Sequence, residues 1–396
     1  MANQTKLQGL YSELCGLSVF RGLLKLPLFK TFFGYCEAEQ GNAKRLTYGA
    51  FVCELYRLGG DLTAVVEQVV FEDENVYVVS FATGQKCNPH IAASAKRELA
   101  ILSEFAALKP SDFAEDMGIT IPSAGFSARR IDLVGRYAKR VKSISKYGYG
   151  IFASHGMFRL SDTDMRKIEP IVSADRIGME SFIGYEEQRA RVVQNTQAFV
   201  DGKPAANVLL YGDAGTGKSS TVKAVANQFY GEGVRLIEIR KDQMSQLPFV
   251  MEQISHNPLK FIIFIDDLSF NRNDDTFSML KAALEGSASA KASNAVIYAT
   301  SNRRHIVREC FDDREGSDVH RNDTMQELLS LSARFGLSIR FEKPNKPLYL
   351  EIVRQLAEKK GIDKDVTQLE IEAEAFALNR GHRSPRCAEQ FIDSLL

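Results

Sequence analysis

Apolar and polar positions follow two different rhythms along the chain, and the rhythm changes near residue 171. Upstream, apolar residues recur at intervals of three and four, which is the spacing of one face of a helix. The clearest such run is Ile91, Ala95, Leu99, Leu102 and Ala106. The pattern predicts a mainly helical domain over residues 1–170. One strand is expected within it at 75–81, where β-branched and aromatic residues gather.

Downstream of residue 171, short apolar runs alternate with helical segments. The runs occupy 207–211, 234–239, 261–265, 295–299 and 336–341. Because they are almost continuously apolar, they indicate strands buried on both faces, as in a parallel sheet between two layers of helices. The sequence therefore predicts a three-layer α/β core over residues 171–345. A helical lid is expected over 346–396, with Ser384 and Pro385 at the start of its last helix.

A glycine-rich loop follows the first of these strands directly. It consists of Gly212, Asp213, Ala214, Gly215, Thr216, Gly217, Lys218 and Ser219, with Ser220 next in the predicted helix. The pattern GxxxxGK[ST] between a strand and a helix is typical of a phosphate-binding loop. Its glycines allow main-chain N–H groups to face phosphate oxygens, Lys218 reaches the terminal phosphates, and Ser219 can ligate Mg²⁺. An ordinary glycine turn is the alternative, and the flanking strand and helix argue against it.

Two carboxylates, Asp266 and Asp267, follow the apolar run 261–265. A carboxylate at the carboxyl edge of a buried strand can hold the water shell of Mg²⁺, and a second one can orient or deprotonate an attacking water. We therefore expect Ser219 and Asp266 at the metal and Asp267 at the water. The alternative interpretation is a solvated start of a loop, which the phosphate loop upstream makes less favourable.

The order of these motifs resembles that of AAA+ ATPases. After the phosphate loop and the acidic pair come a strand that leads to Asn302, an arginine before the last strand, and the small helical lid. The resemblance implies that Asn302 senses the terminal phosphate. It implies that Arg334 is an arginine finger that reaches into a neighbouring subunit of a homo-oligomer. It also implies that Arg386 is the sensor arginine of the lid, with Arg383 as its rival.

The resemblance extends upstream, where Ile183 and Gly184 lie in a segment that would cup the adenine of ATP. Three of the residues assigned by resemblance also have plain structural alternatives. Asn302 could cap a loop, Arg334 could be a surface arginine, and Arg386 could pair with a nearby acid such as Glu389.

More narrowly, the phrases NVLLYGDAGTGKSS, FIDDLSF, LKAALEG, IYATSNRRH and LSARFG resemble a bacterial family of uncharacterised ATP-binding AAA+ proteins, over residues 180–394. The resemblance implies a Mg²⁺-dependent ATPase that remodels a protein partner recruited by the amino-terminal domain. The chain departs from the wider superfamily at Asp267, where Glu is usual. Two alternatives stay open: an initiator-like or loader-like ATPase acting on nucleic acid, and an ATP-binding switch or scaffold with little turnover.

Composition excludes functions that depend on bulk charge. The chain has 50 basic and 50 acidic residues, so its formal net charge is zero, unlike a generally basic nucleic-acid binder. Its six cysteines are scattered without CxxC pairs, which suits reduced thiols. No apolar run approaches the ~20 residues that span a bilayer. The expectation is a cytoplasmic protein without a membrane span.

Local charge is less even than the total. Residues 129–146 hold seven cations and one acid, with Tyr137, Tyr147, Tyr149 and Phe152 in or near them. Such a segment can be a nucleic-acid surface, although a solvated helix face is the commoner origin. Residues 309–323 hold six acids and two cations and are expected to form a surface loop. Cys87 and His90 offer two zinc ligands without a second pair at ligand spacing.

Overall fold

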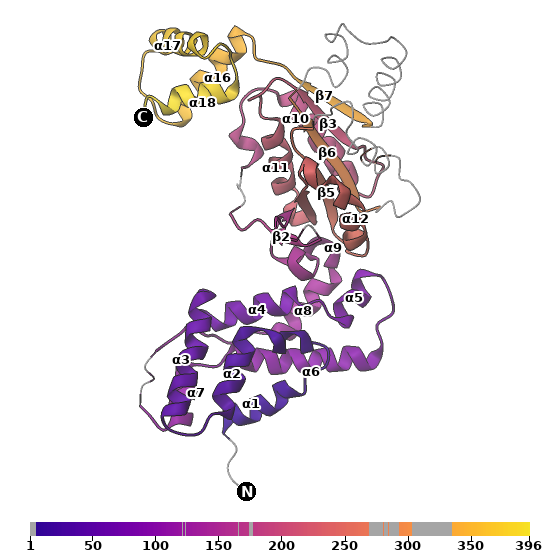
Figure 1. Cartoon of the computed structure of the whole chain (residues 1–396), viewed down its shortest axis with the longest axis vertical. Coiled ribbons are helices and arrows are strands. Elements are labelled where there is room, and N and C mark those ends of the chain that lie inside the picture. The colour runs from indigo at the N-terminus through magenta and orange to yellow at the C-terminus, as the bar shows by residue number, and fades with distance from the viewer. Residues whose placement is uncertain are drawn as a thin grey trace. The chain divides into compact units, whose positions relative to one another are not determined.

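The computed structural model describes residues 5–120, 122, 124–164, 166–173, 177–268, 280, 284, 293–302 and 335–396. The chain divides into two compact units (Figure 1). Unit 1 contains Met1–Ser154 and His256–Pro258, and unit 2 contains His155–Ser255 and Leu259–Leu396. The division falls after Ser154, whereas the sequence pattern predicts a boundary at residue 170. The lid belongs to the same unit as the sheet.

Among the described residues of unit 1, every element of regular secondary structure is a helix. Its elements are α1 Lys6–Cys15, η1 Arg21–Lys25, α2 Pro27–Glu37, α3 Asn42–Arg57, α4 Leu62–Glu72, α5 Val76–Ala82, α6 Pro89–Ala106, α7 Pro110–Met117, α8 Leu133–Lys142, α9 Ile144–Tyr147 and η2 Gly150–Ala153. Aromatic rings fill the centre, where Phe32 lies 4.9 Å from Phe105 and Phe51 stacks on Phe113 at 5.4 Å. The helix predicted from the run 91–106 is α6.

The strand predicted at 75–81 is wrong, because this segment is helix α5. Asn75 caps the helix by accepting a hydrogen bond from the N–H of Val78 at 3.0 Å. Tyr77 and Phe81, four residues apart, place their rings 5.1 Å from each other, as neighbours on one helix face do. The cap and the packing around it outweigh the β propensity of valine and the aromatic residues.

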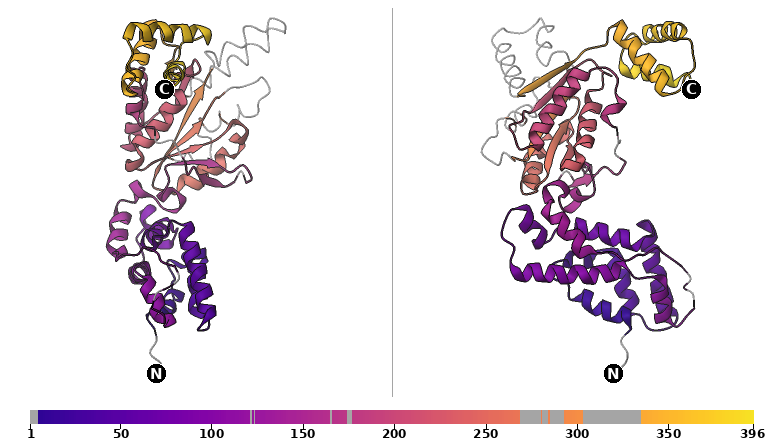
Figure 2. Two further views of the ribbon diagram at one scale, coloured as in Figure 1. Left: turned by 90° about the vertical axis from the view of Figure 1, so that its left-hand side faces the viewer. Right: turned by 180° about the vertical axis from the view of Figure 1, so that it is seen from behind.

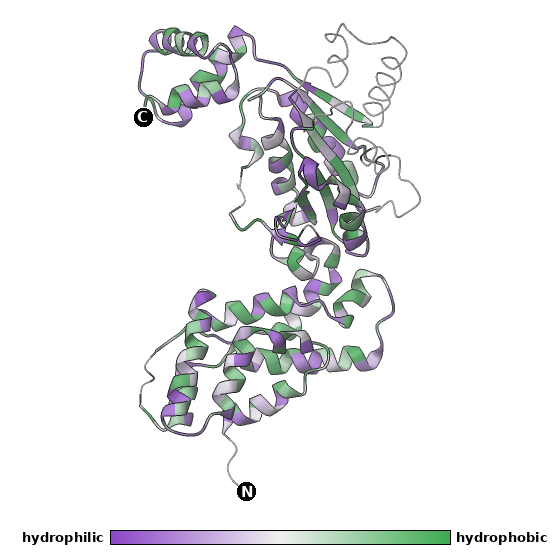
Figure 3. Ribbon diagram, viewed as in Figure 1, coloured by the Kyte–Doolittle hydropathy of each residue, from purple (hydrophilic) through white to green (hydrophobic). Residues whose placement is uncertain are grey.

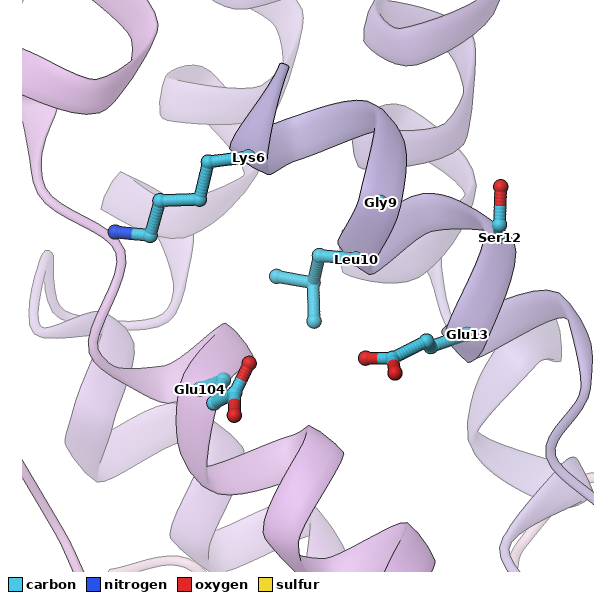
Figure 4. Close-up of a pocket in the computed structure, with 6 residues that line it drawn as sticks. All are labelled: Lys6, Gly9, Leu10, Ser12, Glu13 and Glu104. Carbon is cyan, nitrogen blue, oxygen red and sulfur yellow. The ribbon is translucent and has the colours of Figure 1, made fainter. Parts of the chain in front are cut away.

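A pocket of about 440 Å³ lies in unit 1 between α1 and α6 (Figure 4). Glu13 of α1 and Glu104 of α6 point toward it from the two helices, and Leu10 also lines it. Lys6 at its rim is held by an ion pair with Asp112 at 2.8 Å.

Unit 2 is built on a seven-stranded sheet in the order β2-β1-β4-β5-β6-β3-β7. All neighbours pair in parallel except β1 and β2. The strands are β1 Met157–Leu160, β2 Ile168–Pro170, β3 Val208–Gly212, β4 Val234–Glu238, β5 Lys260–Ile265, β6 Ala295–Ser301 and β7 Leu337–Phe341. The five predicted strands are confirmed. The pattern did not predict β1 and β2, which are short and extend the sheet beyond β4.

Helices cover both faces of this sheet, which confirms the three-layer α/β fold. Helices α10 (Glu186–Val200) and α11 (Lys218–Gln228) lie on one face and α12 (Leu247–Ser255) on the other (Figures 1 and 2). The short turns η3 Met179–Ser181, η4 Tyr230–Glu232 and η5 Lys241–Gln246 complete the unit. The central strands are mostly hydrophobic (Figure 3), as expected of strands buried on both sides.

The lid consists of α16 Lys346–Lys359, α17 Val366–Asn379 and α18 Pro385–Asp393 around a small core of its own. Ser384 caps α18 by accepting a hydrogen bond from the N–H of Cys387, with Pro385 in the first turn, as predicted. Among the described helices, none combines the length and the apolarity that a bilayer crossing would need.

Candidate nucleotide-binding site

The glycine-rich loop lies at the carboxyl end of β3, in the middle of the sheet edge. Gly212, Gly215 and Gly217 have φ angles of 130°, 75° and 88°, which only glycine adopts without strain. A Cβ at Gly212 would lie 2.1 Å from the carbonyl oxygen of Phe341. Helix α11 then begins at Lys218. The glycines are therefore required by the path of the main chain, as a phosphate loop demands.

The main-chain N–H groups of residues 214–220 are the strongest chemical feature of the loop. Within the described part of the chain, none of them donates a hydrogen bond. The first intrahelical bond at this end runs from the N–H of Thr221 to the carbonyl of Gly217, at 2.9 Å. A run of unpaired N–H groups at a helix N-terminus, where the helix dipole is positive, forms an anion-binding site.

The ammonium group of Lys218 lies inside this loop and is only 5% exposed. It donates to the carbonyls of Gly212 at 3.2 Å and Asp213 at 2.7 Å, and to Oδ1 of Asn302 at 2.9 Å. Burial lowers the pKa of Lys218 below its ordinary value, although three nearby carboxylates act in the opposite direction. All three acceptors are neutral, so the charge of Lys218 has no direct ion pair among the described residues.

Asp266 and Ser219 meet where the end of β5 faces the start of α11. The hydroxyl of Ser219 donates to Oδ1 of Asp266 at 2.6 Å. The same oxygen accepts from the hydroxyl of Thr300 and from the N–H of Asp267, at 3.1 Å. Two hard oxygen donors thus lie beside the phosphate loop, which is the ligand chemistry that Mg²⁺ prefers. The residues present therefore fit a magnesium nucleotide.

Asp267 is held in an unusual conformation. Its φ of 51° is in the left-handed region, which among residues other than glycine is best tolerated by Asp and Asn. Its N–H donates to the hydroxyl of Thr300 at 3.0 Å, and its carboxylate accepts from the amide of Asn302 at 2.8 Å. The structure therefore brings Lys218, Asn302 and Asp267 together in one chain of hydrogen bonds.

Thr300 is a residue of this site that the sequence motifs did not single out. Thr300 lies on β6. In the register of the sheet, Ile265 of β5 pairs with Ala299 of β6, so the next residues along the two segments, Asp266 and Thr300, face each other. Its hydroxyl bridges the two aspartates and is part of a side chain only 2% exposed. The order of the strands was needed to find it, because the motif spacing alone does not show that β5 and β6 are neighbours.

The lid brings Arg386 to the phosphate loop and holds Arg383 elsewhere. The N–H of Arg386 donates to the carbonyl of Gly215 at 3.3 Å, and its side chain makes no hydrogen bond or ion pair to a described residue. Arg383 makes a two-bond pair with Glu374, at 2.8 and 2.7 Å. The proposed pairing of Arg386 with Glu389 is absent from the described contacts.

The segment expected to cup the adenine lies against the lid. Ile183 packs on the core of the lid, and a Cβ at Gly184 would lie 3.2 Å from Cδ1 of Leu348 in α16. Tyr185 stacks on Phe341 at 5.4 Å and donates to the carbonyl of Glu342 at 2.5 Å. The segment thus touches both the last strand and the lid.

Other predicted features lie elsewhere or outside the described residues. Arg334 and the acidic stretch 309–323 lie outside them. In the basic segment of unit 1, Arg129 pairs with Asp61 and Arg136 with Glu67, at 2.6 and 2.9 Å. Of the aromatic residues in or near this segment, three are buried and unable to stack on bases: Tyr137, Tyr149 and Phe152. Among the described residues, no group of three or more His, Cys, Asp or Glu side chains could hold a metal.

The strand order, the glycine loop, the acidic pair and the lid define a P-loop ATPase fold of the AAA+ class. The chain belongs to the family described as "Protein of unknown function (DUF815)", whose model matches residues 153–396.

Two proteins of named function are similar to parts of the chain. An ATP-dependent zinc metalloprotease, FtsH 2 of Thermoanaerobacter sp. (strain X514), is 24% identical over 246 residues, which cover 58% of this chain and 44% of that protein. The Thermotoga maritima RuvB Holliday junction branch migration motor aligns with a TM-score of 0.37 and 16% identity, covering 55% of this chain and 63% of that one. A point mutant of the same RuvB aligns with the same score and 15% identity.

Proposed function

We propose that this protein binds ATP with Mg²⁺ at the phosphate loop and hydrolyses it to ADP and phosphate. The observation that carries the proposal is the run of unpaired N–H groups at residues 214–220, closed by the buried ammonium of Lys218. An anion is the natural ligand of such a loop, and the oxygens of Ser219 and Asp266 supply the adjacent metal site.

Each residue of the site has a distinct task in this proposal. The N–H groups of 214–220 hold the phosphates, and Lys218 exchanges its carbonyl and amide acceptors for phosphate oxygens. Ser219 and Asp266 hold the metal and its water shell. Bound Mg²⁺ neutralises charge that develops on the phosphate oxygens during transfer.

Water activation falls to Asp267, with Asn302 beside it. The carboxylate of Asp267 orients the attacking water and accepts its proton. For this, the hydrogen bond from Asn302 to Asp267 must open, and the freed amide of Asn302 can then donate to the terminal phosphate. Thr300 holds the main chain of Asp267 in place throughout, since it bonds the N–H and not the reacting carboxylate.

The lid and a neighbouring subunit complete the proposed site. Arg386 has no other described partner for its side chain, so it is the better candidate for the lid sensor than Arg383, which is held by Glu374. Arg334 would act as an arginine finger in the site of the next subunit of a homo-oligomer, worth about 10³ to 10⁵ in rate. Rotation of the lid against the sheet would then remodel a protein partner held by unit 1.

One observation favours a second candidate, an ATP-binding switch with little turnover. Asp267 is one methylene shorter than the usual Glu, and its carboxylate is engaged by Asn302. A nucleic-acid substrate has less support, because the two arginine pairs of residues 129–146 and the buried aromatic residues in or near them belong to the folding of unit 1.

Single-turnover phosphate release from MgATP by the full chain tests hydrolysis. Lys218→Ala defines the background, and Asp267→Ala should fall to it. Lys203→Ala is the matched control, because Lys203 is exposed and, among the described residues, its one ion pair is with its neighbour Asp201 at 2.9 Å. If ATP binds but phosphate release does not exceed the Lys218→Ala background, hydrolysis is contradicted and the ATP-binding switch is the function that the result supports. Absence of ATP binding in calorimetry would overturn the whole proposal.

Mixing two inactive variants tests the role of Arg334. Lys218→Ala lacks its own site but keeps its finger, whereas Arg334→Ala lacks the finger but keeps its site. If the finger acts between subunits, the mixture should regain part of the ATPase rate that neither variant shows alone. A mixture as inactive as its components would contradict an arginine finger acting in trans.

A further inference from the structure

The start of the phosphate loop is joined directly to the hinge of the lid. Beside the close approach of Gly212 to Phe341, the N–H of Asp213 donates to the carbonyl of Phe341 at 3.0 Å. The carboxylate of Asp213 accepts from the N–H of Lys343 at 2.9 Å. Lys343 lies in the segment 342–345, which connects β7 to α16 of the lid.

Asp213 also bonds two side chains of the phosphate loop, those of Lys218 and Thr216. The carbonyl of Asp213 accepts from the ammonium of Lys218 at 2.7 Å and from the hydroxyl of Thr216 at 2.9 Å. One residue therefore bonds Lys218 through its main chain and the lid hinge through its side chain. Among the residues of the loop, Asp213 alone makes a described side-chain bond to the hinge.

A carboxylate in this loop is electrostatically unfavourable for binding an anion, because its charge repels phosphate. It also favours the charged form of Lys218. A small neutral residue would satisfy the turn between Gly212 and Ala214 without this repulsion. The hydrogen bond to Lys343 gives the carboxylate a separate role, since it satisfies a main-chain N–H at the point where the lid begins.

We propose that Asp213 is a positioning residue that couples the phosphate loop to the lid hinge, a proposal that rests on the proposed binding of ATP. When Lys218 exchanges its carbonyl acceptors for phosphate, the carbonyl of Asp213 loses the hydrogen bond from the ammonium group, and the peptide of Asp213 shifts. This shift moves the carboxylate to which Lys343 is bonded. The second link, from the N–H of Arg386 to Gly215, transmits the same movement to α18.

Hydrogen exchange over residues 342–347 of the full chain, read in peptides that begin at residue 341 or before so that the Lys343 amide is retained, measures this coupling directly. Pro344 and Pro347 carry no amide hydrogen, so this segment reports mainly Lys343, Asn345 and Lys346. In the wild type, MgATP should change its exchange rate. In Asp213→Ala, the segment should exchange about 3- to 10-fold faster without nucleotide, as expected for one lost hydrogen bond. It should then respond no further to MgATP, added at a concentration that saturates the variant as measured by calorimetry.

Two further variants separate the hydrogen bond from the charge. Asp213→Asn keeps an acceptor oxygen and should restore the slow exchange and its response to MgATP. Asp363→Ala removes one acid of the lid that makes no hydrogen bond to a described residue, and it should behave as wild type. If ATP binds but segment 342–347 responds equally in wild type and Asp213→Ala, the coupling is overturned and the proposed function stands. If the wild type fails to bind ATP, both are overturned.

Discussion

The ammonium group of Lys218 donates a 2.9 Å hydrogen bond to the side-chain carbonyl of Asn302, although 84 residues separate them. The two meet because β3, which leads to Lys218, and β6, which leads to Asn302, are adjacent strands of the sheet. The amide of Asn302 donates onward to Asp267 at 2.8 Å. In this structure, Lys218, which is expected to bind phosphate, and Asp267, which is expected to bind water, are therefore joined through the side chain of Asn302.

Substitution of Asn302 by Ala and by Asp should therefore have different effects on ATP affinity. Asn302→Ala removes one neutral hydrogen bond to the terminal phosphate, so affinity should fall by less than about tenfold. Asn302→Asp places a negative charge beside Lys218 and Asp267, where it opposes phosphate, and should weaken binding by about tenfold or more. Calorimetric titration with MgATP measures both. Equal affinities of the two variants would contradict the contact.

Asp267→Glu introduces the residue that is usual in the superfamily. We expect that it does not raise the hydrolysis rate. Glu tolerates the left-handed φ of 51° less well than Asp, so the variant should lose about 1 kcal/mol of unfolding free energy. Asp267→Asn should stay within about 0.5 kcal/mol of wild type while losing hydrolysis. Urea unfolding and single-turnover phosphate release provide the measurements. A Glu variant that is both as stable and faster would refute this account of Asp267.

Thr300→Val keeps the shape of the side chain but removes the hydroxyl that bonds both aspartates. Because Thr300 is buried, the unfolding free energy should fall by about 1–3 kcal/mol. The Mg²⁺ concentration needed for half-maximal ATP binding should rise, since Asp266 loses a bond that orients it. Thr300→Ser retains the hydroxyl and should recover most of both effects. An unchanged Mg²⁺ dependence in Thr300→Val would show that Thr300 is only structural.

Substitutions of Arg383 and Arg386 should have different effects, the first on the stability of the lid and the second on the affinity for ATP. Arg383→Ala removes the pair with Glu374, which is partly exposed, and should cost up to about 1 kcal/mol with little change in ATP affinity. Arg386→Ala removes a side chain without a described partner, so stability should hold while ATP affinity falls about tenfold or more. Thermal unfolding and calorimetry of the two variants decide between them. The reverse pattern would assign the sensor to Arg383.

Acid should destabilise unit 1 through the buried pair of Lys44 and Asp116. Burial by itself would raise the pKa of Asp116, but hydrogen bonds from Lys44 and Tyr35 outweigh it and hold the pKa below its ordinary value. The folded state therefore binds this proton less tightly than the unfolded state does. Its stabilisation is complete above the ordinary pKa of about 4 and is lost as pH falls through the folded-state pKa.

Lys44→Met should reverse this dependence. The variant leaves a buried carboxylate without its cation, which should cost about 3–5 kcal/mol at pH 7. Burial then raises the pKa of Asp116, so mild acid should recover part of the loss, whereas wild type gains nothing from it. Hydrogen exchange of α2, α3 and α7 between pH 5 and 7 follows the local stability. A loss in Lys44→Met that does not lessen toward pH 5 would contradict the buried pair.

Much of the phosphate loop and the sheet could be predicted from residue patterns. The five apolar runs became β3 to β7, because strands buried on both faces need apolar residues at nearly every position. The prediction failed at 75–81, where the same residue types form α5. A short apolar segment carries no periodicity that separates a strand from a helix, and the cap at Asn75 decides the outcome.

By itself, the sequence determined that a glycine loop with Lys218 follows a buried strand and that two aspartates follow another, since these are local patterns. Tertiary structure decided which groups meet. The strand order places β6 between β3 and β5, so Thr300 and Asn302 lie beside both motifs. It also brings β7 against β3, so that Asp213 bonds Lys343 across 130 residues of chain. Contacts between distant segments depend on strand order and register, which residue spacing along the chain does not contain.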